Sequence, residues 1–245
     1  MLKSGAMYSD VVDLRDFYQS SLGQVARRMI RRRIRLIWPD VTGMRVLGLG
    51  YATPYLRPFH DEAERVAALM PAAQGVLQWP RGEKNVAALC DEGELPLQDA
   101  SIDRILLIHA LECSEELRPM LAEVWRVLAG GGRVLIVVPN RRGIWARLDR
   151  TPFGAGHPFT QAQLSRLLRE MAFTPVQSSA ALYIPPSASR MVLSAAGAWE
   201  NIGERWFTSF AGVAMVEATK QIYAKSKPDT RQRRHLVYKP AATSI

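Results

Sequence analysis

The sequence lacks the features that mark several classes of protein. Only two cysteines occur in 245 residues, Cys90 and Cys113, which excludes a disulfide framework and a paired-cysteine metal motif. The longest apolar runs, such as residues 134–138, fall far below the ~18 residues that a membrane-spanning helix needs. The first residues include Asp10 and Asp13 instead of the basic-then-apolar pattern of a secretory signal. We therefore expect a cytoplasmic protein without a transmembrane segment.

Metal and nicotinamide motifs are also missing. The run from Gly48 to Ala52 lacks the third glycine of a dinucleotide-binding fingerprint. The histidines are scattered along the chain, and none stands at a ligand spacing from a second one: His60, His109, His157 and His235. The sequence thus argues against a metalloenzyme and against a nicotinamide-dependent oxidoreductase.

Positive charge is concentrated in two segments of the chain, whose formal net charge is +9. Residues 21–38 hold six arginines and no acid, and residues 218–245 hold seven basic residues against one aspartate. Each segment carries +6, so the rest of the chain carries −3. Such segments are usually solvated faces or mobile tails, but they also suit the phosphates of RNA, and both interpretations stay open.

Helical and strand patterns alternate along the sequence. Apolar residues recur at every third or fourth position over residues 17–38, and Pro39 ends this predicted helix. Helices are also expected at 115–128, 160–171 and 187–204. Apolar strands are expected at 45–50, 65–70, 85–90, 104–108, 133–138, 174–183 and 213–218. A helix that closes on the glycines of residues 130–132 before an apolar strand is typical of a parallel α/β unit.

Several motifs follow one another in a fixed order. The first strand ends in Gly48-Leu49-Gly50, a loop that lets a ligand approach the backbone closely. Residues 91–97 read Asp-Glu-Gly-Glu-Leu-Pro-Leu, Asp103 precedes the strand at 104–108, and residues 123–132 read Glu-Val-Trp-Arg-Val-Leu-Ala-Gly-Gly-Gly. With these motifs, residues 45–139 resemble the class I S-adenosylmethionine-dependent methyltransferases, in the subgroup of methyltransferase-11-type domains.

The resemblance implies an α/β fold with a Rossmann-like, mostly parallel sheet of seven strands flanked by helices. An N-terminal basic helix and a basic C-terminal tail would be additions to this fold. We expect an arm and basic helix at 1–38, the methyltransferase domain at 39–220 and a mostly mobile tail at 221–245.

S-adenosylmethionine is the cofactor that the resemblance implies. Its methionine part would lie against Gly48, Gly50, Tyr51 and Ala52, and its adenine amino group against Asp91. A carboxylate accepts well from such an amine, and amides at a helix start attract the carboxylate of the cofactor.

The sequence departs from the family pattern at two acidic positions. Gly48 stands where the family has Asp or Glu, and Met70 aligns with the acid that accepts the ribose hydroxyls. Loss of such a charge-assisted contact costs roughly 1.5–3 kcal/mol. We therefore expect weak cofactor binding, with a Kd on the order of tens of micromolar or poorer.

Two histidines are candidate catalytic residues, His109 as a general base and His157 as a substrate or lid residue. His109 would end the fourth strand, near the transferred methyl group and among the cofactor contacts, and His157 lies in a loop after the fifth strand. Either could instead be structural: His109 as a buried histidine satisfied by backbone, and His157 as a residue that packs its loop. Glu112 would either orient His109 or cap the following helix.

The methyl acceptor is expected to be a small molecule or an unidentified substrate. The alternatives are a degenerate binding subunit that acts through a protein partner, and an RNA-directed enzyme that uses the basic arms. The segment 140–159 carries Trp145, Phe153 and Phe159, which suit a lid over the substrate, a docking surface for a partner, or simple core filling. The basic helix should dock its apolar face near the cofactor, with Arg27, Arg31 and Arg35 exposed.

Overall fold

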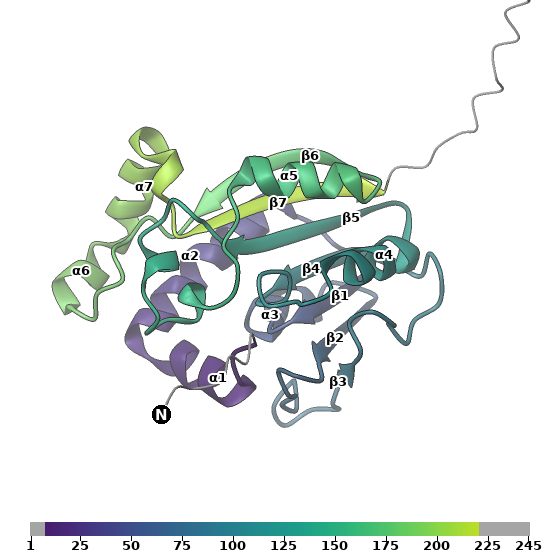
Figure 1. The fold of residues 1–245 in the computed structure, drawn as a ribbon. Coiled ribbons are helices and arrows are strands. Elements are labelled where there is room, and N and C mark those ends of the chain that lie inside the picture. Colours follow the sequence, from purple (N-terminus) through teal and green to yellow (C-terminus); the bar gives the residue numbers. More distant parts are fainter. Residues whose placement is uncertain (1–7, 221–245) are drawn as a thin grey trace, which may run out of the picture.

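A seven-stranded sheet forms the centre of the molecule, in the order β3-β2-β1-β4-β5-β7-β6 (Figure 1). The computed structural model describes residues 8–220. The strands are β1 (Arg45–Gly50), β2 (Arg65–Pro71), β3 (Ala87–Cys90), β4 (Ile102–Ile108), β5 (Leu128–Pro139), β6 (Phe173–Ala181) and β7 (Val213–Lys220). Only β7 runs antiparallel to its neighbours. The mostly parallel, seven-stranded α/β fold expected from the sequence is confirmed.

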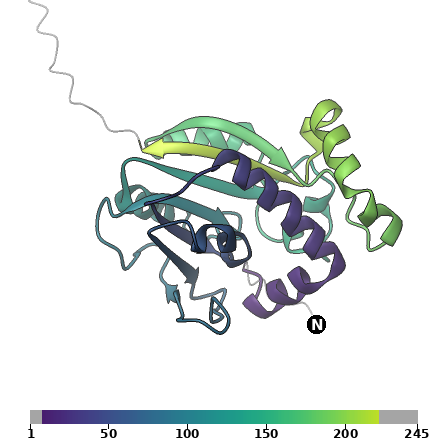
Figure 2. The same ribbon diagram turned by 180° about the vertical axis from the view of Figure 1, so that it is seen from behind.

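Helices cover both faces of the sheet. One face carries α1 (Val11–Gln19), α2 (Ser21–Ile37) and α3 (Thr53–His60), and Figure 2 shows α2 crossing it. The other carries α4 (Leu117–Val127) and α5 (Gln161–Glu170). Short helices α6 (Arg190–Ser194) and α7 (Ala196–Trp206) project at one end, and single 3₁₀ turns occur at Trp145–Arg147, Pro152–Gly154 and Thr208–Phe210. Alternate strand residues point to the two faces, so the helices enclose two apolar layers.

The single helix predicted at 17–38 is two helices. Ser20 has extended backbone (φ −65°, ψ 158°), and its Oγ accepts a hydrogen bond from the amide of Gly23 at 3.0 Å. A capping serine of this kind starts a new helix, which apolar periodicity alone did not reveal. The corner lets α1 turn across the carboxyl ends of the strands while α2 packs on the sheet face. The helix predicted at 187–204 is similarly divided, at Ala195.

Glycines 130–132 belong to β5 and are not a separate turn before it. This strand begins at Leu128, which pairs with Ile102, and the pairing register shifts before Arg104 meets Arg133. Gly131 has φ +78°, a conformation that glycine adopts at little cost. The glycines therefore accommodate the shift in pairing register near the start of β5.

The basic helix α2 is fixed to the sheet by a buried polar contact. The indole of Trp38, at its end, donates to Glu217 Oε1 at 2.9 Å, and Arg133 holds the other oxygen of Glu217 at 3.0 Å. Both Trp38 and Glu217 are almost fully buried. The helix thus packs into the same core as the methyltransferase-like region, and its apolar face docks as expected.

The expected exposure of the arginines on α2 was wrong. Arg27, Arg31 and Arg35 are half-buried, whereas Arg28 and Arg32 are exposed. The reason is that α1 and α3 flank α2 and cover part of its polar side. None of the helices formed by residues 8–220 has the length and apolar character that a bilayer crossing requires.

The aromatic segment after β5 is part of the core. Trp145 and Phe153 are each 1% exposed, and the indole of Trp145 donates to the carbonyl of Ile184 at 2.8 Å. Phe153 packs edge-on against Phe17 of α1. The interpretation of these two rings as a docking surface for a partner is therefore wrong. The predicted tail at 221–245 lies outside the described residues.

Candidate functional site

The carboxyl end of β1 is a tight glycine turn. Gly50 has φ +81°, and a Cβ there would lie 2.4 Å from the carbonyl oxygen of Ile108 at the end of β4. A Cβ on Gly48 would lie 2.7 Å from both Ala52 Cβ and Leu56 Cδ1. Since α3 approaches β1 this closely, no acidic side chain fits at Gly48. The packing thus explains the first departure from the family pattern.

Helix α1 covers the point where β1, β2 and β4 end. The amide of Val11 donates to the carbonyl of Gln74, which follows β2, at 2.8 Å. The side-chain amide of Gln74 donates in turn to the carbonyl of His109 at 2.8 Å. At the other end of α1, the ring of Tyr18 stacks on Tyr51 of the glycine loop, with a centroid separation of 5.8 Å. The loop of β1 is therefore closed off by a tyrosine.

A chain of buried hydrogen bonds runs through this tyrosine. The hydroxyl of Tyr55 donates to the hydroxyl of Tyr18 at 2.8 Å, and the latter lies 2.7 Å from His109 Nε2. His109 Nδ1 lies 3.4 Å from Glu112 Oε1. All four side chains are at most 4% exposed. Burial is the main cause that raises the pKa of Tyr18 and of Tyr55, so both remain hydroxyl donors.

The position of Glu112 favours one tautomer of His109. A carboxylate beside Nδ1 favours the ring proton on that nitrogen, and in this tautomer Nε2 accepts from the hydroxyl of Tyr18, which accepts in turn from Tyr55. His109 itself has φ +52°, the left-handed conformation that a histidine adopts only where the surroundings hold it. The second oxygen of Glu112, Oε2, has no hydrogen-bond partner among residues 8–220. Such a buried, oriented imidazole can accept a proton at Nε2.

A separate cavity of about 530 Å³ lies at the carboxyl ends of β2 and β3. Asp91 and Glu92 line it together with Pro71, Ala72 and Cys90. Asp91 accepts a hydrogen bond from the amide of Gly93 at 2.8 Å, which leaves its other oxygen open to the cavity. Met70, at the expected position of the ribose acid, is 1% exposed and packs in the apolar core.

Tyr8 closes this cavity toward the histidine. Its hydroxyl donates to Glu92 and lies 3.3 Å from the carbonyl oxygen of Ala110. Burial and the adjacent Glu92 carboxylate both raise the pKa of Tyr8. The segment from Tyr8 to Tyr18 thus covers both parts of the predicted cofactor site.

His157 supports the site through its backbone. Its amide donates to the carbonyl of Glu112 at 2.7 Å, and the adjoining Gly156 (φ +72°) lets the two chains approach. The side chain of His157 is exposed and does not join the buried chain of hydrogen bonds. A catalytic role for His157 stays a prediction, and the contact that the structure shows is one of its backbone.

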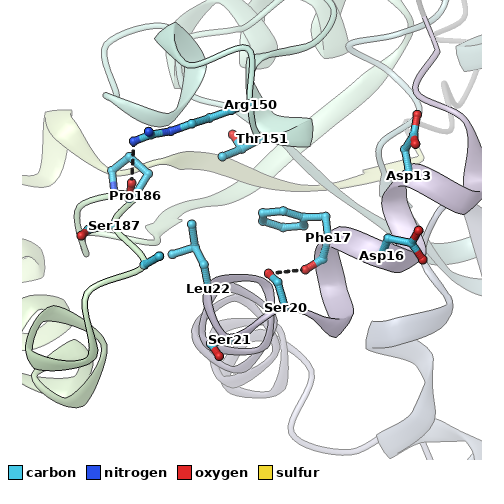
Figure 3. Close-up of a pocket in the computed structure, with 11 residues that line it drawn as sticks. Asp13, Asp16, Phe17, Ser20, Ser21, Leu22, Arg150, Thr151, Pro186 and Ser187 are labelled. Atoms are coloured by element: carbon cyan, nitrogen blue, oxygen red, sulfur yellow. Dashed lines mark hydrogen bonds between the residues drawn. The ribbon is translucent and has the colours of Figure 1, made fainter.

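A further cavity of about 700 Å³ lies beside the corner between α1 and α2. Figure 3 shows Arg150 reaching the carbonyl of Pro186 and Ser20 reaching the carbonyl of Phe17. These polar groups are already bonded to the protein, and Asp13 and Asp16 lie at one side. Within the described chain, the cavity therefore offers little that would orient a reacting group.

Comparisons with known proteins agree with this geometry. Residues 47–136 match the family described as "Methyltransferase domain". No curated protein sequence matches the chain significantly. Over these residues the chain is similar to S-adenosylmethionine-dependent methyltransferases. The family match supports S-adenosylmethionine as the cofactor that goes with the domain.

Solved structures show the same fold at low sequence identity. A methyltransferase of Thermotoga maritima has a TM-score of 0.62 and 16% identity, and the match covers 86% of this chain and 96% of that one. The 1,6-didemethyltoxoflavin-N1-methyltransferase of Burkholderia thailandensis, solved with S-adenosylhomocysteine, has a TM-score of 0.54, 17% identity and coverages of 86% and 84%. A complex of the Haloferax volcanii Trm112 methyltransferase activator with a methyltransferase gives a TM-score of 0.55, 14% identity and coverages of 86% and 92%.

The residues present fit the two ends of the cofactor differently. The cavity beside Asp91 offers the adenosine end space and an open carboxylate oxygen. At the methionine end, Tyr18 fills the space above Gly50 and Tyr51. This end fits the cofactor only after Tyr18 has moved away.

Sequence reasoning missed the residues that close the site. Tyr8, Tyr18, Tyr55 and Gln74 stand outside every motif of the methyltransferase domain. Tyr18 and His109, for example, are 91 residues apart in the chain. The only signal was Tyr18 among the apolar residues of the helix predicted at 17–38, which core packing explains equally well.

Proposed function

We propose that this chain is an S-adenosylmethionine-dependent methyltransferase that acts on a small molecule, and that α1 covers its cofactor site between turnovers. The observation that carries the proposal is the buried, oriented His109 at the end of β4. In a class I domain, the ends of β1 and β4 flank the place where ligands bind. An imidazole held there by Glu112 suits proton removal from an oxygen or nitrogen nucleophile.

Each residue has a definite role in this proposal. Asp91 accepts from the adenine amine, while the backbone of Gly50 and Tyr51 contacts the methionine part. The cofactor supplies an electrophilic methyl group on a sulfonium. Once the Tyr18 hydroxyl leaves Nε2, His109 accepts the proton of the nucleophile, and Glu112 stabilises the resulting imidazolium from the Nδ1 side.

A second candidate is a binding subunit on a degenerate domain. It is favoured by the hydrogen bonding of Tyr18, which is complete without any ligand. If the closed arrangement were permanent, the domain would act through a partner and would not transfer a methyl group. Exposed apolar side chains suited to contact do occur on α7 and just after it, at Trp206, Phe207 and Phe210.

Cofactor titration separates the two candidates. Calorimetry with S-adenosylhomocysteine should give a Kd on the order of tens of micromolar, because one charge-assisted contact is missing at Met70. The absence of heat at millimolar ligand, in protein that is folded by circular dichroism, would favour the binding subunit.

Matched variants locate the ligand. Asp91→Asn keeps the acceptor for the Gly93 amide but removes the charge, and should weaken binding about tenfold to a hundredfold. Glu115→Gln makes the same charge change on the same cavity and should leave the Kd within about twofold. Equal effects of the two variants would mean that general acidity, and not a contact with Asp91, governs binding.

A further inference from the structure

A cavity of about 690 Å³ between α1, α2, α3 and the segment after β2 is lined by arginines. Five guanidinium groups face it, and no acidic residue is among its lining residues. They come from four separate parts of the chain: Arg15, Arg27, Arg31, Arg57 and Arg81. Because α1, α2 and α3 pack side by side on this face, the tertiary structure gathers charges that the sequence scatters (Figure 2).

Two of these arginines are neutralised at the rim. Arg15 pairs with Asp16 at 2.8 Å, and Arg57 pairs with Glu83 at 3.1 Å. Arg27, Arg31 and Arg81 form no ion pair with any residue in the range 8–220. Elsewhere on α2, Arg33 pairs with Glu204, while the exposed Arg28 and Arg32 are also without an ion pair among residues 8–220. What sets Arg27, Arg31 and Arg81 apart is that they line one cavity together.

The arginines converge on the glycine loop. Burial raises the pKa of Tyr51, and the positive charges of Arg15, Arg81 and Arg27 oppose that rise, which places all three within electrostatic reach of one hydroxyl. Tyr18, Thr53 and Pro54 also line the cavity, so it extends from the loop after β1 to the histidine chain. Like charges gathered in a confined space repel one another unless an anion lies between them.

We propose that this cavity binds the phosphate groups of a phosphorylated small molecule. The planar guanidinium fork matches phosphate oxygens in a bidentate manner, and three unpaired forks suit a ligand with more than one phosphate charge. The half-buried Trp79 and the ring of Tyr51 provide apolar walls for the rest of the ligand. Tyr18 lies between this cavity and His109. The further idea that the phosphorylated ligand is also the methyl acceptor therefore rests on the proposed function, in which Tyr18 moves away.

Two double variants with the same charge change test the site. Arg27→Gln with Arg31→Gln removes cavity arginines, whereas Arg28→Gln with Arg32→Gln removes exposed arginines from the same helix. Titration with inorganic pyrophosphate should give measurable binding to the unmodified protein, at least a tenfold loss in the first variant and less than a twofold change in the second. Equal losses in both variants, or no binding by the unmodified protein at millimolar pyrophosphate, would overturn the proposal.

Thermal melting gives a second measurement on the same proteins. Without ligand, Arg27→Gln with Arg31→Gln should melt no lower than the unmodified protein, because repulsion among the cavity arginines is relieved. If this variant fails to fold, Arg81→Gln in the loop after β2 replaces it in the titration, with the same expected loss.

Competition experiments identify the class of ligand that the cavity binds. Arg27, Arg31 and Arg81 lie outside α1, so pyrophosphate should still bind when saturating S-adenosylhomocysteine has displaced Tyr18, and loss of pyrophosphate binding would mean that the cavity holds the carboxylate of the cofactor. Single-stranded RNA is the second competitor. If the unmodified protein binds it more tightly than pyrophosphate, and both double variants bind it equally more weakly, the arginines form a nucleic-acid surface and the proposal is overturned. The pyrophosphate titration does not depend on cofactor binding. Absence of cofactor binding would contradict the proposed function alone, whereas absence of pyrophosphate binding would contradict the phosphate site alone.

Discussion

Replacement of Tyr18 by phenylalanine tests whether α1 closes the cofactor site. The change removes one buried hydroxyl and keeps the ring that stacks on Tyr51. That hydroxyl takes part in two hydrogen bonds, from Tyr55 at 2.8 Å and to His109 Nε2 at 2.7 Å. Both bonds exist only while α1 lies over the strand ends. The substitution therefore weakens the closed state and leaves the open state almost untouched.

The size of the effect follows from the two bonds. A neutral intramolecular hydrogen bond contributes about 1 kcal/mol net, so the closed state should lose about 2 kcal/mol. If the cofactor binds only to the open state, its apparent affinity should rise by up to about thirtyfold. The free energy of unfolding should fall by a similar 2 kcal/mol or so, which lowers the melting temperature by roughly 4–8 °C for a domain of this size.

Calorimetry with S-adenosylhomocysteine and thermal melting measure the two quantities on the same samples. Tyr183→Phe is the control, since the hydroxyl of Tyr183 makes no hydrogen bond to another of the described residues, and Tyr183 follows β6 and does not contact the ring of His109. It should change neither affinity nor melting. A fall in cofactor affinity with Tyr18→Phe would show that the hydroxyl helps to bind the ligand. Lower stability with unchanged affinity would show that α1 never opens. Either result refutes the closing role of α1.

Three further predictions concern packing and burial at the site and at α7. Gly50→Ala should lower the free energy of unfolding by about 3 kcal/mol in urea titrations, because its Cβ meets the Ile108 carbonyl at 2.4 Å in addition to positive-φ strain. Gly43→Ala has the strain alone and should cost about 1 kcal/mol, so equal losses would contradict this account. Burial and the nearby acids Glu92 and Asp91 raise the pKa of Cys90 to about 12, so iodoacetamide at pH 8 should label it only after unfolding, as mass spectrometry can follow. Burial also raises the pKa of Glu200, so ionisation of this carboxyl lowers the free energy of unfolding as the pH rises through that pKa. Glu200→Gln should therefore have the same free energy of unfolding as the parent at pH 4 and a higher one at pH 8. A difference between the two proteins that does not change with pH would contradict this prediction.

The departures from the family pattern have different physical origins. Gly48 is required because α3 packs directly on β1, so an acid there is excluded by space. Met70 belongs to the apolar layer under α1 and α2, so its position serves the core. In both places, packing with the N-terminal helices and α3 has replaced groups that would otherwise contact a cofactor.

The sequence by itself determined the sheet and the methyltransferase domain. Strand and helix signals are local, since alternation and apolar periodicity arise within a few residues, and all seven strands were found near their observed positions. Gly50 and Asp91 were predicted as cofactor contacts for the same reason, because each belongs to a short motif that follows a strand. Boundaries were less certain where a single side chain decides them, as Ser20 does between α1 and α2.

Only the tertiary structure decided how the site is closed and charged. Tyr18 contacts His109, 91 residues away in the chain, and Arg27 and Arg81 line the same cavity beside α1, α2 and α3. No local pattern encodes such encounters, because they depend on the angle at Ser20 and on how closely α3 approaches β1. The exposure predicted for Arg27 and Arg31 failed for this reason: helical periodicity tells which residues share a face, but only packing decides what lies opposite that face.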